Sequence, residues 1–350
     1  MGNQPVLSVI IAVYNAEKTI ARCLDSIFRQ RDSLTRPDDV EVIAVDDASP
    51  DGSGEIMAKY RKGHPSLTIV SHSENKREAN TRNTGIDHCN GEYFTFLDAD
   101  DEYAPGALES ILGAIEDKHP DLIHYCYSRV SADGEFVSRT RFHNPGFHLT
   151  AAEDAPTLRA VFQDTAFGLM TSGGVYRREV AQDLNFSSDF PISPDRHFGW
   201  EFFRKCTNVF QIDEPLYIYY QYEDSVSRQL TDEAVKGLLR LDRIFWEEFH
   251  QHPAFPSAAQ YGFRRLFPGV VGWHLDIVSG TDPAKRFLRP LYFDILNSYL
   301  GRTANDELGK LGLAWLKAAQ LLRSPRMIRL FRSWTFGIWR PMKSCLNRPK

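Results

Sequence analysis

The first half of the chain alternates short apolar runs with segments of helical spacing. Apolar, largely β-branched runs cover residues 7–13, 40–45, 67–70, 93–97 and 122–127, as expected for strands buried on both faces. Helical spacing lies between them, over residues 16–30, 53–60, 80–89 and 107–115. Strands and helices that alternate with short connections predict an α/β fold with a parallel sheet. Ligands of such sheets bind at the carboxyl ends of the strands.

The pattern becomes less regular after residue 128. Residues 128–150 are polar and rich in turn formers, with a hairpin predicted around 132–134. A turn of small residues at 171–174 leads into a strand, a helix is predicted to start at Pro194, and a tyrosine-rich strand covers 214–220.

The last third of the chain has helical character. Thr231 begins an amphipathic segment with two acidic residues in its first turn, and further helical segments are predicted up to residue 322. We therefore expect two parts, an α/β domain over residues 1–228 and a helical C-terminal region over residues 229–350.

Composition excludes several classes of protein. The net charge of -5 and the absence of a recognisable binding module argue against nucleic acid as a partner. Five scattered cysteines without a C-x-x-C pair favour reduced thiols over a disulfide framework or a zinc site. The N-terminal apolar run has no basic region before it, and no apolar stretch of about 18 residues occurs. We expect a cytoplasmic protein that is either free or attached peripherally to the membrane.

Polar side chains gather where three of the predicted strands end. The first strand is followed by Tyr14 and Asn15, the second by Asp46 and Asp47, and the fourth by Asp98, Ala99, Asp100 and Asp101. Helix capping, for example by Asp101 or Glu102 before Pro105, would explain one such cluster. Three clusters on one sheet would face a single crevice. Carboxylates at this density repel one another unless a cation compensates, and oxygen ligands suit Mg²⁺ or Mn²⁺.

Four segments make the first 225 residues resemble a family 2 glycosyltransferase of the GT-A fold. They are residues 9–15 (VIIAVYN), 45–52 (VDDASPDG), 82–85 (RNTG) and 91–101 (GEYFTFLDADD), in this order and at family-like spacing. Residues 213–219 are similar to a common late strand of these enzymes. The resemblance implies a Rossmann-like, mostly parallel sheet flanked by helices. It also implies inverting transfer of a sugar from a nucleotide-sugar to an acceptor hydroxyl.

The resemblance assigns roles in donor binding. Asp100 would be the direct ligand of Mn²⁺ or Mg²⁺, which stabilises the departing nucleoside diphosphate, and Asp98 would reach the ribose or help to hold the metal. Asp47 would accept the pyrimidine N–H, which favours a UDP-sugar. The remaining residues of the donor pocket would be Ala12, Val13, Tyr14 and Asn75. Ala12 stands where the family often has proline, and Arg77 replaces a glycine that often follows Asn75, which leaves the conformation of this loop open.

Two further residues have a functional and a structural interpretation. Arg82 matches an arginine that contacts the donor near the diphosphate or holds the aspartates; alternatively, it is an ion-pair partner beneath the site. Asp195 stands where the family has the catalytic aspartate of a Glu-Asp pair, with Pro194 in place of the glutamate. A general base there would take the proton of the acceptor hydroxyl. Alternatively, Asp195 caps the helix, or Glu201 is the base.

The acceptor side is less defined by the sequence. The turn at 171–174 would face the acceptor, Trp200 is either an aromatic platform for a sugar or a core residue, and His197 is a candidate for a metal or phosphate contact. From Lys317 onward basic and aromatic residues interleave without any acidic residue. This tail suits an anionic membrane surface, as a lipid-linked acceptor would require, or else packs on the catalytic domain.

Two other functions are compatible with these residues. A metal-dependent nucleotidyl or phosphoryl transferase would use the same aspartates, but the chain has neither a P-loop nor a lysine cluster beside them. A non-catalytic scaffold that binds a nucleotide-sugar is favoured only by Pro194 in place of the glutamate.

Overall fold

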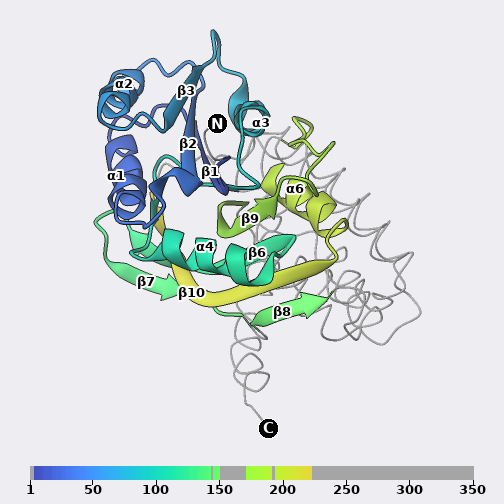
Figure 1. Cartoon of the computed structure of the whole chain (residues 1–350). Coiled ribbons are helices and arrows are strands. Elements are labelled where there is room, and N and C mark those ends of the chain that lie inside the picture. Colours follow the sequence, from blue (N-terminus) through green and yellow to red (C-terminus); the bar gives the residue numbers. More distant parts are fainter. Residues whose placement is uncertain (1–3, 143–144, 150–170, 191–193, 223–350) are drawn as a thin grey trace, which may run out of the picture. The chain divides into compact units, whose positions relative to one another are not determined.

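The structure is a computed structural model that describes residues 4–142, 145–149, 171–190 and 194–222 (Figure 1). The chain divides into two compact units, Met1–Leu241 and Asp242–Lys350, and every described residue lies in the first. The predicted boundary near residue 228, the helical C-terminal region and the basic tail lie outside the described residues. A search of the described residues finds no helix of the length and apolarity that a membrane span needs.

Four parallel strands form the N-terminal half of one sheet. They lie side by side in the order β3 (Leu67–Ser71), β2 (Val40–Asp46), β1 (Leu7–Val13) and β4 (Tyr93–Phe96). Each agrees with its predicted strand to within one residue at either end. The prediction succeeded because these runs are apolar on both faces, as helices on both sides of a sheet require.

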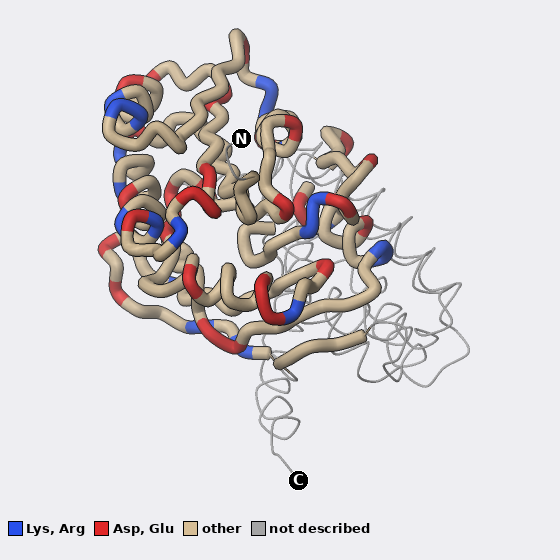
Figure 2. Tube along the Cα trace, viewed as in Figure 1, with Lys and Arg blue, Asp and Glu red and all other residues tan. Residues whose placement is uncertain are grey.

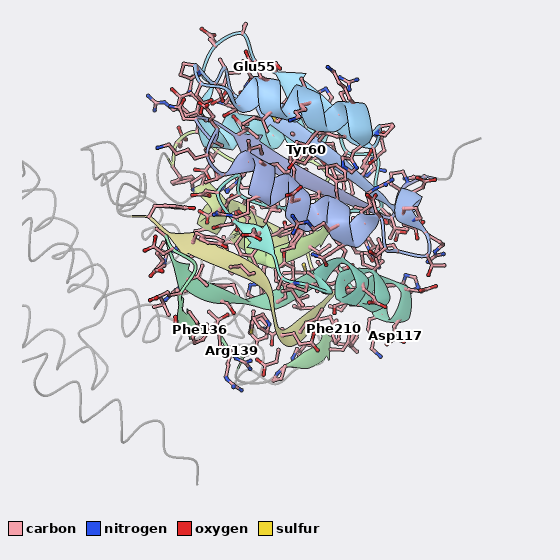
Figure 3. The ribbon with its side chains drawn as sticks, turned by 90° about the vertical axis from the view of Figure 1, so that its left-hand side faces the viewer. Glu55, Tyr60, Asp117, Phe136, Arg139 and Phe210 are labelled. Carbon is pink, nitrogen blue, oxygen red and sulfur yellow. The ribbon has the colours of Figure 1, made fainter. Side chains whose placement is uncertain are left out.

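Helices cover both faces of this parallel half. Figure 3 shows α1 (Ile20–Arg31) and α2 (Ser53–Gly63) side by side, and the Tyr60 hydroxyl of α2 donates to Oδ1 of Asp25 in α1 at 2.8 Å. Basic and acidic residues are interspersed along both helices (Figure 2). The α3 helix (Arg77–Asp87) lies across the sheet from them (Figure 1). α1 begins four residues later, and α3 three residues earlier, than helical spacing predicted.

The C-terminal half of the sheet is mixed. From β4 it continues through β9 (Gly174–Arg177), β6 (Leu122–Ser131), β10 (Asn208–Gln221) and β5 (Glu102–Tyr103). β9 is antiparallel to both of its neighbours, whereas β6 and β10 are parallel. Two short strands, β7 (Phe136–Arg139) and β8 (Gly146–Leu149), pair with β6 and β10. The mostly parallel sheet that the sequence predicted is confirmed, and β9 is the reversed strand at its centre.

Two short 3₁₀ helices and the α4 helix connect strands in the two halves of the sheet. The 3₁₀ helices are η1 (Pro37–Asp39), before β2, and η2 (Thr171–Gly173), before β9. The α4 helix (Ala107–Lys118) follows β5, and its N-cap residue is Gly106 without a side-chain capping bond. Neither Asp101 nor Glu102 therefore caps this helix.

An aromatic layer attaches α6 (Pro194–Phe203) to the sheet. Phe198 stacks on Phe186 with ring centroids 4.2 Å apart, and Phe202 meets Tyr176 of β9 edge-on at 4.9 Å. Aromatic pairs of this kind add about 0.5–1.5 kcal/mol each to the burial of their surface. Because the layer fixes α6, it also fixes the first turn of that helix, which carries Asp195.

Candidate active site

Three strand ends meet at one edge of the sheet, as the sequence predicted. β2, β1 and β4 are neighbours and run in the same direction. The N–H of Asp47, just past β2, donates to the carbonyl of Val13 at the end of β1 at 2.8 Å. The N–H of Leu97, just past β4, donates to Ile10 of β1 at 2.9 Å. The loops that begin at Tyr14, Asp47 and Asp98 therefore start from one short row of residues.

The end of β1 presents its side chains unequally. Val13 is fully buried in the core, so only its backbone faces the loops. Ala12 is half-buried, and Tyr14, which is 49% exposed, extends its ring toward solvent. Asn15, after β1, and Ala48, after β2, have positive φ angles of 53° and 57°. These angles turn both loops sharply away from their strands. A flat ligand stacked at this edge would meet the ring of Tyr14.

Asp47 organises the loop that precedes α3. Its Oδ1 accepts the N–H of Lys76 at 2.8 Å and lies 2.7 Å from Nδ1 of His72, and its Oδ2 accepts the N–H of Arg77 at 2.9 Å. The Asn75 side chain accepts from the same N–H of Arg77 at 3.1 Å. These bonds settle the conformation that the sequence left open, with Arg77 at a φ of 69°. A carboxylate has about four lone-pair sites, so Oδ2 can still accept one further donor.

Asp98 is held from three directions. Its Oδ1 receives Nη2 of Arg82 at 2.9 Å, and its Oδ2 receives the hydroxyls of Ser172 and Tyr217, both at 3.3 Å. The Asp98 side chain nevertheless remains 29% exposed. It is thus a carboxylate with a fixed orientation and an open side, as a ligand site requires.

Asp100 and Asp101 differ sharply in their surroundings. Asp101 is buried, and it accepts the Tyr217 hydroxyl at 2.6 Å and the N–H of Tyr220 at 2.8 Å. Asp100 is exposed, and in the described part of the chain no other side chain donates to its carboxylate. The protein packed around the exposed Asp100 carboxyl partly desolvates it and, together with the charge of Asp98, raises its pKa to about 6.

This arrangement fits a divalent cation. No group of three or more His, Cys, Asp or Glu side chains among the described residues forms a complete metal site. Mg²⁺ is commonly held by only one or two carboxylates together with phosphate oxygens and water, so a complete protein cage is not required. Asp100, with an open carboxylate beside Asp98, would be the ligand.

Arg82 of α3 is buried beneath the aspartates. Its Nη2 lies 2.9 Å from Asp98 and 2.7 Å from Oε1 of Glu78, and its Nη1 donates to the Thr171 hydroxyl at 3.2 Å. Burial lowers the pKa of Arg82, but the negative charges of Glu78, Asp98 and Asp195 raise it by more than burial lowers it. The net shift of the pKa is therefore upward, and the guanidinium stays charged. These contacts agree both with an arginine that holds the aspartates and with a structural ion-pair partner beneath the site, so the functional role of Arg82 stays a prediction.

Asp195 lies in the same electrostatic environment. Burial raises its pKa to about 6, against the lowering effect of Arg82 and with a further rise from Glu78 and Asp98. These influences indicate that the carboxylate lies within electrostatic range of the Arg82 cluster, although it comes from α6, far along the chain from α3 and the acidic loop. A half-buried carboxylate that titrates near neutrality suits a general base.

The family model for glycosyl transferase family 2 matches residues 8–184, about half of the chain. The chain belongs to glycosyl transferase family 2. The matched range contains the loops after β1, β2 and β4, as well as Arg82, but ends before Asp195.

Two curated relatives are similar to this family 2 chain. The uncharacterized glycosyltransferase EpsJ of Bacillus subtilis is 29% identical over 228 residues, which cover 64% of this chain and 63% of the relative. The amylovoran biosynthesis glycosyltransferase AmsB of Erwinia amylovora is 31% identical over 189 residues, which cover 52% of this chain and 59% of the relative. In both cases the chain spans less than two thirds of the relative's own length.

A solved structure establishes the fold. The structure of Staphylococcus aureus TarS, residues 1–349, in complex with UDP-GlcNAc superposes with a TM-score of 0.71 at 19% identity. The superposition covers 94% of this chain and 92% of that one. The GT-A fold predicted from the sequence is thereby confirmed.

Three further residues that the sequence raised as candidates lie on α6, the helix that carries Asp195. Trp200 is 2% exposed and is a core residue, so it offers no platform to a sugar ring. Glu201 pairs with Arg204 at 3.3 Å on α6. The ring of His197 stacks on Phe190 at 4.7 Å.

Glu78 and Tyr217 were not assigned a role from the sequence, and Ser172 was predicted only as part of a turn that faces the acceptor. Glu78 stands four residues before Arg82 in α3, a spacing that brings two helical side chains together and could have identified the pair. Ser172 and Tyr217 reach Asp98 from 74 and 119 residues away. Nothing local to either residue indicates that contact.

We predict that Arg82→Met lowers the free energy of unfolding by about 1–3 kcal/mol, because it leaves the Asp98 and Thr171 groups without their donor. The loss should be smaller than the 3–5 kcal/mol of a fully buried pair, since Asp98 and Glu78 retain contact with water. Urea denaturation measures it. As a control, Arg29→Met removes an exposed pair of α1 and should change stability by less than about 0.5 kcal/mol. Equal effects of the two variants would contradict the role given to Arg82.

Proposed function

We propose that this chain is an inverting glycosyltransferase that transfers a sugar from a UDP-sugar to a hydroxyl of a glycan or lipid-linked acceptor. The observation that carries the proposal is the Arg82–Asp98 ion pair at the sheet edge of a family 2 chain, with the exposed Asp100 two residues further on and Asp195 within electrostatic range of the pair. These groups could hold a diphosphate through a cation and accept a proton from an acceptor.

The nucleoside would lie at the ends of β1 and β2. The exposed Tyr14 ring provides a surface on which a pyrimidine can stack, and the backbone of Val13 provides the floor. Oδ2 of Asp47, which among the described residues accepts the Arg77 N–H, would accept the pyrimidine N–H as well, at the 3% of the side chain that remains exposed. Asn75 and Ala12 would complete the pocket around the base.

The diphosphate would lie beside Asp98 and Asp100. Asp100 would be the protein ligand of Mn²⁺ or Mg²⁺, and Asp98, oriented by Arg82, Ser172 and Tyr217, would accept from the ribose or assist the metal. The bound cation would stabilise the negative charge that develops on the departing diphosphate. Arg82 contributes indirectly, because it keeps Asp98 oriented and charged.

Asp195 would act as the general base. Its carboxylate takes the proton of the acceptor hydroxyl while that oxygen attacks the donor carbon from the face opposite the departing diphosphate. This geometry inverts the configuration at the carbon. Arg82, whose charge acts on Asp195, would keep a fraction of it ionised at neutral pH despite burial.

The acceptor is proposed from relatives and from the tail. The name of AmsB connects that protein with biosynthesis of a polysaccharide, amylovoran, which supports a surface glycan as the product here. The basic and aromatic residues after Lys317 would attach the protein to the cytoplasmic, anionic face of the membrane, where a lipid-linked acceptor would be found. The turn at η2 is buried and holds Arg82 and Asp98, so its contribution to the acceptor side would be indirect.

We predict that UDP raises the melting temperature of the protein, and that Mn²⁺ increases this effect. The reason is that Asp100 and the diphosphate would share the cation. Thermal-shift titration with UDP, GDP, dTDP and ATP, each with and without Mn²⁺, measures it. Stabilisation by ATP alone would favour a nucleotidyl or phosphoryl transferase instead. Binding of UDP without transfer to any acceptor would favour a non-catalytic scaffold.

We predict that kcat/KM for sugar transfer falls below about pH 6 and is level above it. The folded-state pKa of Asp195 is raised to about 6, so the carboxylate loses its base form as the pH falls through that value. Asp195→Asn should lower kcat by about 10²–10⁴-fold with little change in UDP binding. The matched control is Asp189→Asn, an exposed residue of the preceding loop. Full activity of Asp195→Asn would exclude Asp195 as the base.

We predict that deletion of the chain after Arg323 releases the protein from anionic membranes. The deleted residues include most of the basic groups of the tail, each of which contributes about 1 kcal/mol near such a surface. Co-sedimentation with vesicles of phosphatidylglycerol and phosphatidylcholine measures the change, with pure phosphatidylcholine as the control. Equal binding of the full and shortened chains would exclude the tail as the attachment.

A further inference from the structure

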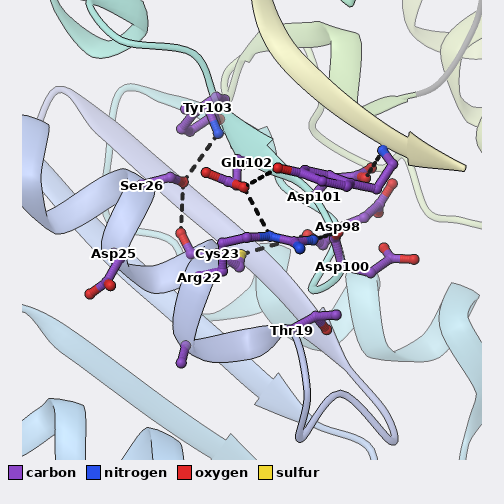
Figure 4. A network of polar contacts seen from close by, with 12 residues as sticks. Thr19, Arg22, Cys23, Asp25, Ser26, Asp98, Asp100, Asp101, Glu102 and Tyr103 are labelled. Carbon is purple, nitrogen blue, oxygen red and sulfur yellow. Dashed lines mark hydrogen bonds and ion pairs between the residues drawn. The ribbon is translucent and has the colours of Figure 1, made fainter. Parts of the chain in front are cut away.

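One row of polar residues on α1 faces the segment that follows Asp98. Arg22, Ser26 and Gln30 are spaced four residues apart, so they share one side of the helix. Ser26 accepts the N–H of Tyr103 at 3.1 Å, and Gln30 accepts the N–H of Leu108 at 3.3 Å. Figure 4 shows Arg22 and Ser26 reaching from α1 toward this segment. The row thus binds the chain on the C-terminal side of the acidic loop.

Arg22 reaches the acidic loop itself. Its Nη2 donates to the backbone carbonyl of Asp100 at 2.6 Å, and its Nε lies 2.9 Å from Oε1 of Glu102 (Figure 4). The same guanidinium lies over the ring of Tyr220, 3.7 Å from its centroid, and Nη2 also donates to the Tyr222 hydroxyl at 3.0 Å. One side chain therefore joins α1, the acidic loop and the end of β10.

These contacts bear on Asp100 in a way that the Asp98 contacts do not. The carboxylate of Asp98 is oriented by Arg82, Ser172 and Tyr217 directly. The carboxylate of Asp100 receives no donor from another side chain in the described part of the chain, so its position follows from its own backbone. The Arg22 bond fixes that backbone at the carbonyl of Asp100, next to the carboxylate that would meet the cation.

We propose that Arg22 is a positioning residue for the Asp100 carboxylate, and that Tyr222 at the end of β10 holds the Arg22 guanidinium in place. The inference rests on the proposed function, since it concerns the carboxylate that would bind the metal and the diphosphate. The ion pair between Arg22 and Glu102 is half-buried, and a pair that keeps contact with water adds only modest stability by itself. Its effect lies in the placement of a ligand, where loss of an outer-shell contact typically weakens metal binding about 10- to 100-fold.

Loss of Arg22 should affect UDP binding differently in the presence and in the absence of Mn²⁺. The base pocket at Tyr14 and Asp47 lies at the ends of other strands and makes no contact with Arg22 in the described structure. Loss of Arg22 should therefore weaken the binding of UDP in the presence of Mn²⁺ about 10- to 100-fold and leave the binding of UDP alone nearly unchanged. A variant that merely loosened the fold would weaken both.

The test is calorimetric titration of UDP into the full-length protein, with and without Mn²⁺. The variants are Arg22→Ala, Arg22→Lys, Tyr222→Phe and, as the matched control two turns further along α1, Arg29→Ala, which removes only an exposed pair with Asp25. Arg22→Lys keeps the charge but not the fork of donors, so it should recover only part of the loss. Tyr222→Phe, which removes one hydroxyl, should give a smaller loss of the same kind. Hydrogen exchange of residues 98–103, without nucleotide or metal, should rise in Arg22→Ala and not in Arg29→Ala.

The possible outcomes are separable. If the unmodified protein does not bind UDP in the presence of Mn²⁺, the proposed function fails. If it binds UDP but Arg22→Ala and Tyr222→Phe bind equally well, the positioning role is wrong. Equal weakening with and without Mn²⁺ would also overturn it, since that result indicates a general structural effect. Should Arg22→Ala not fold, Arg22→Lys and Tyr222→Phe still decide the question.

Discussion

The compensation of negative charge at the end of β4 is the constraint on which the rest of the site depends. Two arginines lie beside this region: Arg82 from α3 pairs with Asp98, and Arg22 from α1 binds the backbone carbonyl of Asp100 and lies beside the Glu102 carboxylate. Each would be costly to bury alone, and each carboxylate would repel its neighbours without them. The helices on both sides of the sheet must therefore keep their places for the acidic loop to exist in this form.

The segment Arg82-Asn83-Thr84-Gly85 holds α3 in its place beside the sheet. Arg82 binds Asp98, and Asn83 exchanges two hydrogen bonds with the backbone of Phe186, at 2.7 and 2.9 Å. The hydroxyl of Thr84 lies 2.9 Å from Nε2 of His72, which in turn contacts Asp47. Gly85 lies against Ile10 of β1, where a Cβ would come within 2.2 Å of a methyl group. One residue of the motif contacts the acidic loop, and the other three fix the helix that carries it.

The sequence predicted the parts of the site that depend on local pattern. The strands 7–13 and 40–46 are largely apolar runs, and the residues that end them are displayed at the sheet edge by topology alone. The roles of residues fixed by long-range pairing were not accessible in the same way. Asp101 could be given a capping role from its position, but its partner is Tyr217, 116 residues away. The reversed direction of β9 likewise depends on its neighbours β4 and β6 and not on its own four residues.

Gly91, the glycine that opens the segment 91–101, also fixes the acidic loop through the packing of a neighbouring strand. At Gly91 a Cβ would lie 2.8 Å from the backbone nitrogen and 2.7 Å from the hydroxyl of Ser8, so only glycine allows β4 to start against β1. Glu41 of β2 completes the junction by accepting from the Ser8 hydroxyl at 2.6 Å and from the N–H of Gly91 at 3.2 Å. This junction lies at the amino ends of the strands, far along β4 from Asp98. It sets the register of β4 against β1, and that register determines where the strand ends and its carboxylates begin.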